Sequence, residues 1–160
     1  MSSPRQFQSH LPTADGRFTL LTLGTARLAE ADQATGAPGA DRLPPGKGLA
    51  LVVYLHCSPG RTATREHLTD RFWNDCSPEA ARQTLRQTIY RIRAALGAEA
   101  ITSDGESVTL NLDLTCDRDL FLAAIHGGRA SEAVGLYGGQ FFPAYAAPGA
   151  AGFEQWADLE

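Results

Sequence analysis

The chain has 160 residues, of which 43% are hydrophobic and 20% are charged, and its net charge is −4 at pH 7. This composition excludes a disordered tail, and the length fits one ordinary domain or a small domain with an appendage. The charge is unevenly distributed. Residues 1–45 are balanced, residues 46–97 carry eight basic and four acidic side chains (+4), and residues 98–160 carry two basic and ten acidic (−8). Because charge indicates partners rather than fold, a negatively charged partner is expected at the middle third.

Membrane and secretory signals are missing from the sequence pattern. No window approaches the roughly eighteen apolar residues of a transmembrane helix, so we expect no membrane partner. The opening MSSPRQFQSH lacks the apolar stretch of a secretory signal, and we expect a flexible leader over residues 1–16. Three cysteines without a CxxC pair favour a reduced, cytoplasmic compartment. The neighbours His56 and Cys57 alone are weak evidence for zinc, and we predict no metal site and no cofactor.

Two antiparallel strands are predicted first, because residues 16–24 (GRFTLLTLG) and 25–32 (TARLAEAD) alternate between apolar and polar side chains. Residues 33–40 (QATGAPGA) are predicted to form a loop, and the following DRLP a short third strand. The apolar segment 46–58 (GKGLALVVYLHCS) fits a buried helix or a buried strand by periodicity alone. Its length favours a helix.

A pair of helices follows. Thr64 is a suitable N-cap for the segment TREHLTDRFW, in which Leu68 and Phe72 form a buried face. After a short break, Ser77 is the predicted N-cap and Gly97 the end of a longer helix. The segments AITS and SVTLNL then flank DGE, which predicts a hairpin. Three short helices separated by glycines are predicted between residues 116 and 160.

The longer helix, residues 77–97, has a distinctive exposed face. At about 100° per residue, its core-facing residues are Leu85, Ile89, Ile92 and Leu96. The predicted base-facing residues are Gln83, Gln87 and Tyr90, and the arginines at their margins are Arg82, Arg86, Arg91 and Arg93. Guanidinium groups pair with phosphate or guanine, and glutamine can bond both N6 and N7 of adenine. The alternative is a plain solvated helix. However, such helices usually mix charges, and this one has no acidic residue after Glu79.

The order of these elements predicts a winged helix-turn-helix of the α+β class, with a short helical extension at its C-terminus. In that fold the second helix of the pair enters the major groove and the hairpin contacts the flanking DNA backbone. Further candidate phosphate contacts lie at or before helix starts, namely Lys47, Arg61 and Arg65. For Arg93, near the core flank, a buried pair with a carboxylate is the alternative to DNA contact.

A family resemblance agrees with this fold. The segment RQTLRQTIYRIRAALG resembles the recognition helix of OmpR/PhoB-type winged-helix domains, and residues 56–97 are similar to the DNA-binding domain of the Streptomyces antibiotic regulatory protein family, the AfsR-like activators. The shared features are the Pro59–Gly60 turn, the spacing of Leu68, Phe72 and Trp73, and the helix start PEAAR. Downstream, CDRDLF, LYGGQFFPAY and FEQW are similar to the opening of that family's bacterial transcriptional activation domain.

The resemblance implies a four-stranded sheet packed on three helices and closed by the wing. It also implies promoter binding at direct repeats by two protomers in tandem, with recruitment of RNA polymerase. The domain division that follows is a winged helix over residues 17–112 and a partial activation domain over residues 113–160. In the family this second module is larger, so Phe153, Trp156 and Leu159 are expected either to cover the core themselves or to meet a partner.

Two features of the sequence depart from the family pattern. The wing reads SDGESVTL where the family has a Gly-Tyr-Arg-like run, and the carboxylates of Asp104 and Glu106 repel phosphate, so a strong wing contact with DNA is not expected. The loop 33–40 is also longer than the family's tight turn.

Catalytic motifs are not found. The segment PPGKG lacks the glycine and the Ser or Thr of a phosphate-binding loop, and neither GxSxG nor HExxH occurs, so we predict that the protein is not an enzyme.

The second hypothesis for the function is a protein-interaction module. In it, the acidic C-terminal segment docks a basic partner or folds back over the arginine-rich helix and masks it.

Overall fold

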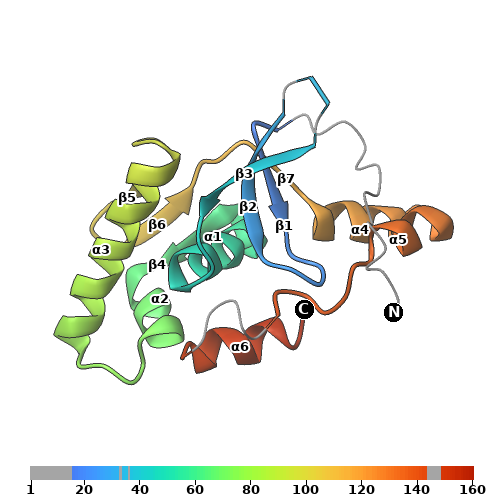
Figure 1. Ribbon diagram of the computed structural model, residues 1–160. Coiled ribbons are helices and arrows are strands. Elements are labelled where there is room, and N and C mark those ends of the chain that lie inside the picture. Colours follow the sequence, from blue (N-terminus) through green and yellow to red (C-terminus); the bar gives the residue numbers. More distant parts are fainter. Residues whose placement is uncertain (1–15, 33, 36, 144–148) are drawn as a thin grey trace, which may run out of the picture.

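The computed structural model describes residues 16–32, 34, 35, 37–143 and 149–160 (Figure 1). Except for Gly16, the predicted leader lies outside these residues. Within these ranges, two small sheets and six α-helices form the α+β architecture that the sequence predicts. Among the described residues, no helix has the length and apolar character needed to cross a membrane.

The first sheet has four strands in the order β3-β2-β1-β7. Strands β1 (Phe18–Leu21) and β2 (Arg27–Ala31) are the predicted antiparallel pair, and β3 (Pro38–Leu43) lies antiparallel to β2. The predicted loop over 33–40 is therefore wrong in its second half, because Pro38 already pairs with Ala31. Register shifts along this pair interrupt regular alternation, which is why the segment looks like a loop in the sequence.

Strand β7 (Leu114–Cys116) is the fourth strand, and it lies parallel to β1. The sequence pattern does not predict this strand and suggests only helices in the C-terminal region. A strand of three residues is too short to show alternation, and its hydrogen bonds come from β1, which lies about a hundred residues earlier.

Helix α1 (Lys47–Cys57) confirms the choice of helix over strand for the apolar segment, and its residues 49–55 are all buried. A 3₁₀ turn, η1 (Pro59–Arg61), and the short strand β4 (Thr62–Thr64) lead into α2 (Arg65–Phe72). The Thr64 side chain accepts a hydrogen bond of 3.1 Å from the backbone N–H of His67, which confirms the predicted N-cap.

Helix α3 (Pro78–Leu96) is the longest element, and the wing follows it as β5 (Ile101–Ser103) and β6 (Ser107–Leu110). These two strands join β4 in a second sheet of order β4-β6-β5. As Figure 1 shows, α3 lies at one side of the molecule with the wing beside it, and the C-terminal helices α4 and α5 lie at the opposite side. The predicted hairpin is confirmed.

The C-terminal region contains α4 (Asp117–His126), α5 (Ala130–Leu136) and α6 (Ala151–Ala157), at the places predicted for three short helices. Helix α6 packs against α2: the Phe153 ring lies 5.3 Å from that of Phe72, and Trp156 lies 4.8 Å from Tyr54. Phe153 and Trp156 therefore cover the core, one of the two outcomes expected for them. Leu159 remains 85% exposed.

The division at residue 112 stays a prediction. Strand β7 completes the first sheet and Phe153 belongs to the same buried cluster as Leu68, although both follow residue 112 in the chain. A truncation after Leu112 would therefore remove a sheet strand and part of the core.

Candidate nucleic-acid interface

Helix α3 presents the face that its periodicity predicts. Its first turn is held by Ser77, whose side chain accepts a 3.3 Å hydrogen bond from the Ala80 backbone N–H, and it ends at Gly97, which has φ 110°. The four predicted core-facing residues, Leu85, Ile89, Ile92 and Leu96, are all buried. Six of the seven predicted contact residues on this helix are exposed, namely Arg82, Gln83, Arg86, Gln87, Tyr90 and Arg91. Tyr90 is 74% exposed, which is unusual for a large aromatic ring.

The arginines of this exposed face differ from the other arginines of the described chain. Five arginines on other elements form ion pairs with carboxylates, namely Arg17, Arg27, Arg42, Arg118 and Arg129. Arg82, Arg86 and Arg91 have neither an ion pair nor a hydrogen bond with any residue that the structure describes. The guanidinium groups of these three arginines therefore lie on the same face as Gln83 and Gln87, and their N–H donors are free to bind an external anion.

The other four predicted contact residues are already engaged inside the protein. Arg93 donates from Nε to the Ile101 carbonyl at 2.8 Å, so its partner is a backbone oxygen of the wing rather than a carboxylate. Arg65 donates from Nη1 to Ser103 Oγ at 2.5 Å, also in the wing. These two bonds hold the wing against α2 and α3.

Arg61 and Lys47 likewise have internal partners. The Arg61 guanidinium donates to the Leu112 carbonyl at 2.8 Å. The Lys47 ammonium lies 5.7 Å from the centroid of the Trp73 ring, a cation–π distance. A contact with DNA stays a prediction for Arg61, Lys47, Arg65 and Arg93. In the structure each of these side chains has a contact within the protein.

Residues 44–107 match the family model described as "Transcriptional regulatory protein, C terminal". The matched segment contains α1, α2, α3 and β5. Regulatory protein AfsR of Streptomyces griseus is 32% identical to it over 124 residues, which are 73% of this chain and 12% of AfsR. The resemblance to the AfsR-like activators is therefore confirmed, and the family is one of regulators, not of enzymes. The chain spans only about an eighth of the AfsR length.

A solved structure shows the same fold. EmbR of Mycobacterium tuberculosis, determined in complex with a low affinity phosphopeptide, superposes with a TM-score of 0.64 at 18% identity. The match covers 91% of this chain and 42% of the EmbR chain, so it extends beyond the segment that the family model matches. The predicted winged helix-turn-helix fold is confirmed, and α3 is the second helix of its helix pair.

The tip of the wing is acidic, and its carboxylate is used in the turn. Asp104 Oδ1 accepts hydrogen bonds from the backbone N–H groups of Ser107 (2.7 Å) and Glu106 (2.8 Å). These bonds hold the pKa of Asp104 below its ordinary value, so the carboxylate is charged at neutral pH. A negative wing tip supports the expectation that the wing contributes little phosphate binding.

One exposed residue of the recognition helix was missed from the sequence. Ala94 lies one turn beyond Tyr90 and continues the row of Gln83, Gln87 and Tyr90 on the exposed side of α3. A methyl group there is suited to contact with a thymine methyl group. An alanine carries no charge or hydrogen-bonding group, so the pattern offers no signal that would single it out.

Proposed function

We propose that the protein is a sequence-specific DNA-binding regulator whose helix α3 enters the major groove. The observation that carries this proposal is the exposed face of α3, where Arg82, Arg86 and Arg91 have no partner among the described residues. At 19 residues the helix is about 28 Å long, enough to lie along the groove with both ends near phosphates.

Within the groove, the roles divide by position on the helix. The row of Gln83, Gln87 and Tyr90 faces the base edges, and the arginines on its two margins meet the phosphates of the two strands. Arg65 and Arg93 fix the wing beside this helix through their bonds to Ser103 and Ile101. The wing thus lies next to the flanking backbone without supplying positive charge.

The resemblance to AfsR extends the proposal to the assembled regulator. We propose an activator that binds direct repeats as two protomers in tandem and contacts RNA polymerase, acting in the cytoplasm. Support comes from the order of the elements, a winged helix followed by helices that resemble the opening of an activation module. The helix pair α4–α5 lies at the far side of the molecule from α3 (Figure 1).

The alternative of a masked protein-interaction module is less well supported. Its masked form requires the acidic C-terminal segment to lie over α3, and its other form requires this segment to dock a basic partner. Among the described residues, this segment packs on α2 and on the end of the first sheet, where the backbone N–H of Gly24 donates to the Gln140 carbonyl at 2.8 Å. The side chains of Gln87 and Tyr90 stay exposed with the segment in place.

Selection from a random duplex library, followed by titration of the recovered sequence against salt, tests the proposal. A motif repeated at a spacing of about one helical turn is the expected result, since tandem protomers then lie on one side of the duplex. No enrichment, with weak binding that disappears at physiological salt, would support the protein-interaction module instead.

Replacing Gln87 by alanine is expected to change base preference rather than general affinity. The loss should be about 1–3 kcal/mol at one position of the selected site and close to zero for an unrelated duplex, because only the base contact is removed. Competition binding with single-position variants of the site measures this. Gln155→Ala, an exposed glutamine on α6, is the matched control and should leave the preference unchanged.

A further inference from the structure

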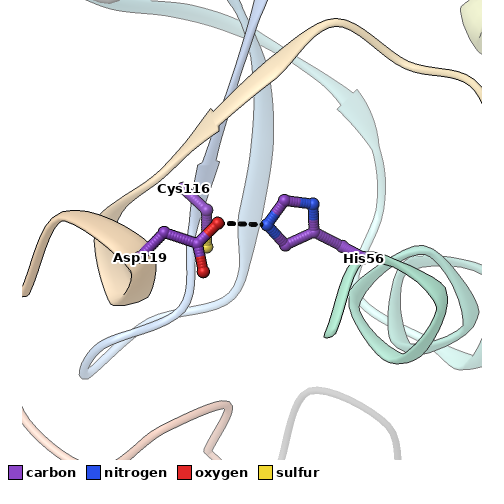
Figure 2. A group of neighbouring side chains, drawn as sticks. All are labelled: His56, Cys116 and Asp119. Atoms are coloured by element: carbon purple, nitrogen blue, oxygen red, sulfur yellow. Dashed lines mark hydrogen bonds and ion pairs between the residues drawn. The ribbon is translucent and has the colours of Figure 1, made fainter. Parts of the chain in front are cut away.

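Three potential metal ligands meet at the junction between the winged helix and the C-terminal helices. His56 comes from the last turn of α1, Cys116 from the end of β7 and Asp119 from the first turn of α4. Figure 2 shows the three side chains converging, and their ligand atoms all lie within 4.8 Å of one another. His56 Nε2 and Asp119 Oδ2 are only 2.6 Å apart.

The His56 side chain is only 4% exposed, and it directs Nε2 toward the other two ligands. Its second ring nitrogen, Nδ1, is buried without a hydrogen-bond partner among the described residues, but it points away from Cys116 and Asp119 (Figure 2). A metal ion in this cluster would therefore bind at Nε2.

We propose that His56, Cys116 and Asp119 bind one divalent transition-metal ion, with zinc the best fit. Imidazole, thiolate and carboxylate together form a ligand set of the kind that zinc takes, and three protein ligands leave a fourth position open. Bond lengths of about 2.0–2.3 Å place tetrahedral ligands about 3.5 Å apart. The most widely separated ligand atoms, within 4.8 Å of one another, would approach by about 1 Å, and His56 Nε2 and Asp119 Oδ2, 2.6 Å apart, would separate by about 1 Å. This proposal revises the sequence-based expectation of no metal site.

The ligand set can neutralise a divalent ion. When the metal–sulfur bond forms, the S–H bond breaks and its proton passes to solvent, while the metal's oxidation state is unchanged. One carboxylate and one thiolate then balance the ion's two positive charges.

The position of the site indicates how a bound metal ion would affect stability. The three ligands lie on α1, β7 and α4, so a bound ion would tie the C-terminal helices to the core helix of the winged domain. Because the unfolded chain does not hold the three ligands together, metal binding favours the folded state. The melting temperature is therefore expected to rise with zinc concentration.

Titration of the full chain with Co²⁺ tests the proposal, because a thiolate–cobalt bond gives a near-ultraviolet charge-transfer band that other ligands do not. We expect one Co²⁺ per chain with this band, and its displacement by Zn²⁺. Cys116→Ser should abolish the band, and Asp119→Asn, at a half-exposed position, should weaken affinity by about tenfold or more. Cys76→Ser, an exposed cysteine away from the cluster, should leave both unchanged.

Two results would overturn the proposal. One is the absence of a thiolate–cobalt band in the wild-type chain at millimolar Co²⁺. The other is a band that persists in Cys116→Ser and disappears with Cys57→Ser or Cys76→Ser. Because Cys116 is buried, circular dichroism must show that its variant is folded; if it is not, loss of affinity in His56→Ala and Asp119→Asn decides the question.

Discussion

Alanine at Arg82, Arg86 and Arg91 together is expected to lower DNA affinity by about 10²–10³-fold, and to do so at every sequence. Each of these guanidinium groups is exposed and has no partner among the described residues, so each is free to form a charge-assisted bond with phosphate. Such bonds contribute about 1–1.5 kcal/mol each after desolvation, and three of them give the stated range. Fluorescence anisotropy with the selected duplex and an unrelated duplex measures the loss.

The matched control removes the same charge elsewhere. Arg17 and Arg129 are exposed, Arg27 is partly exposed, and all three are ion-paired with carboxylates. A triple alanine variant at these positions has the same net charge as the α3 variant. Its affinity should fall by less than about threefold, because surface ion pairs contribute little and these side chains lie away from α3. Equal losses in the two variants would mean that net charge, rather than the face of α3, determines binding.

Asp117→Ala is expected to lower the free energy of unfolding by about 3–5 kcal/mol. Asp117 is buried, and its carboxylate accepts bonds from the Thr22 backbone N–H (2.8 Å), the Thr22 hydroxyl (2.7 Å) and the Leu23 backbone N–H (3.0 Å). Alanine leaves these buried donors unpaired at about 1–3 kcal/mol each. Urea denaturation followed by circular dichroism measures the change, and the melting temperature should fall by roughly 6–20 °C.

Two variants separate this bond network from simple loss of charge. Asp117→Asn keeps one acceptor oxygen and should cost about half as much, whereas Asp113→Ala removes an exposed carboxylate from the same segment and should change stability by less than about 0.5 kcal/mol. If Asp117→Ala costs less than about 1 kcal/mol, the bonds from Asp117 to residues 22 and 23 do not hold α4 to the first sheet.

The recognition helix could be derived from the sequence because its determinants are local. Ser77 and Gly97 mark its ends, and Leu85, Ile89 and Ile92 fall on one side of a 3.6-residue period, so the opposite face follows directly. The same applies to Thr64 as N-cap of α2. The DNA-contacting roles of Arg82, Arg86 and Arg91 remain predictions, but the exposure on which they depend is seen in the structure.

The features that were missed depend on contacts between distant residues. Strand β7 gains its pairing from β1, and Asp117 binds Thr22 across 95 positions of the chain. His56 forms its hydrogen bond with Asp119, which lies 63 positions away in the chain, and not with its sequence neighbour Cys57. The hydrogen-bond partner of Arg93 also could not be predicted from the sequence. Periodicity places it on the flank of α3, but only the position of the wing shows that its partner is the Ile101 carbonyl.

The salt dependence of binding tests the central claim most directly. Affinity for the selected duplex is measured at several salt concentrations for the wild-type chain and for the triple variant of Arg82, Arg86 and Arg91. If these arginines meet phosphates, the slope of log affinity against log salt becomes shallower by about 0.9 for each phosphate that is no longer neutralised, or roughly 2–3 in total. An unchanged slope would contradict the placement of α3 against the DNA backbone.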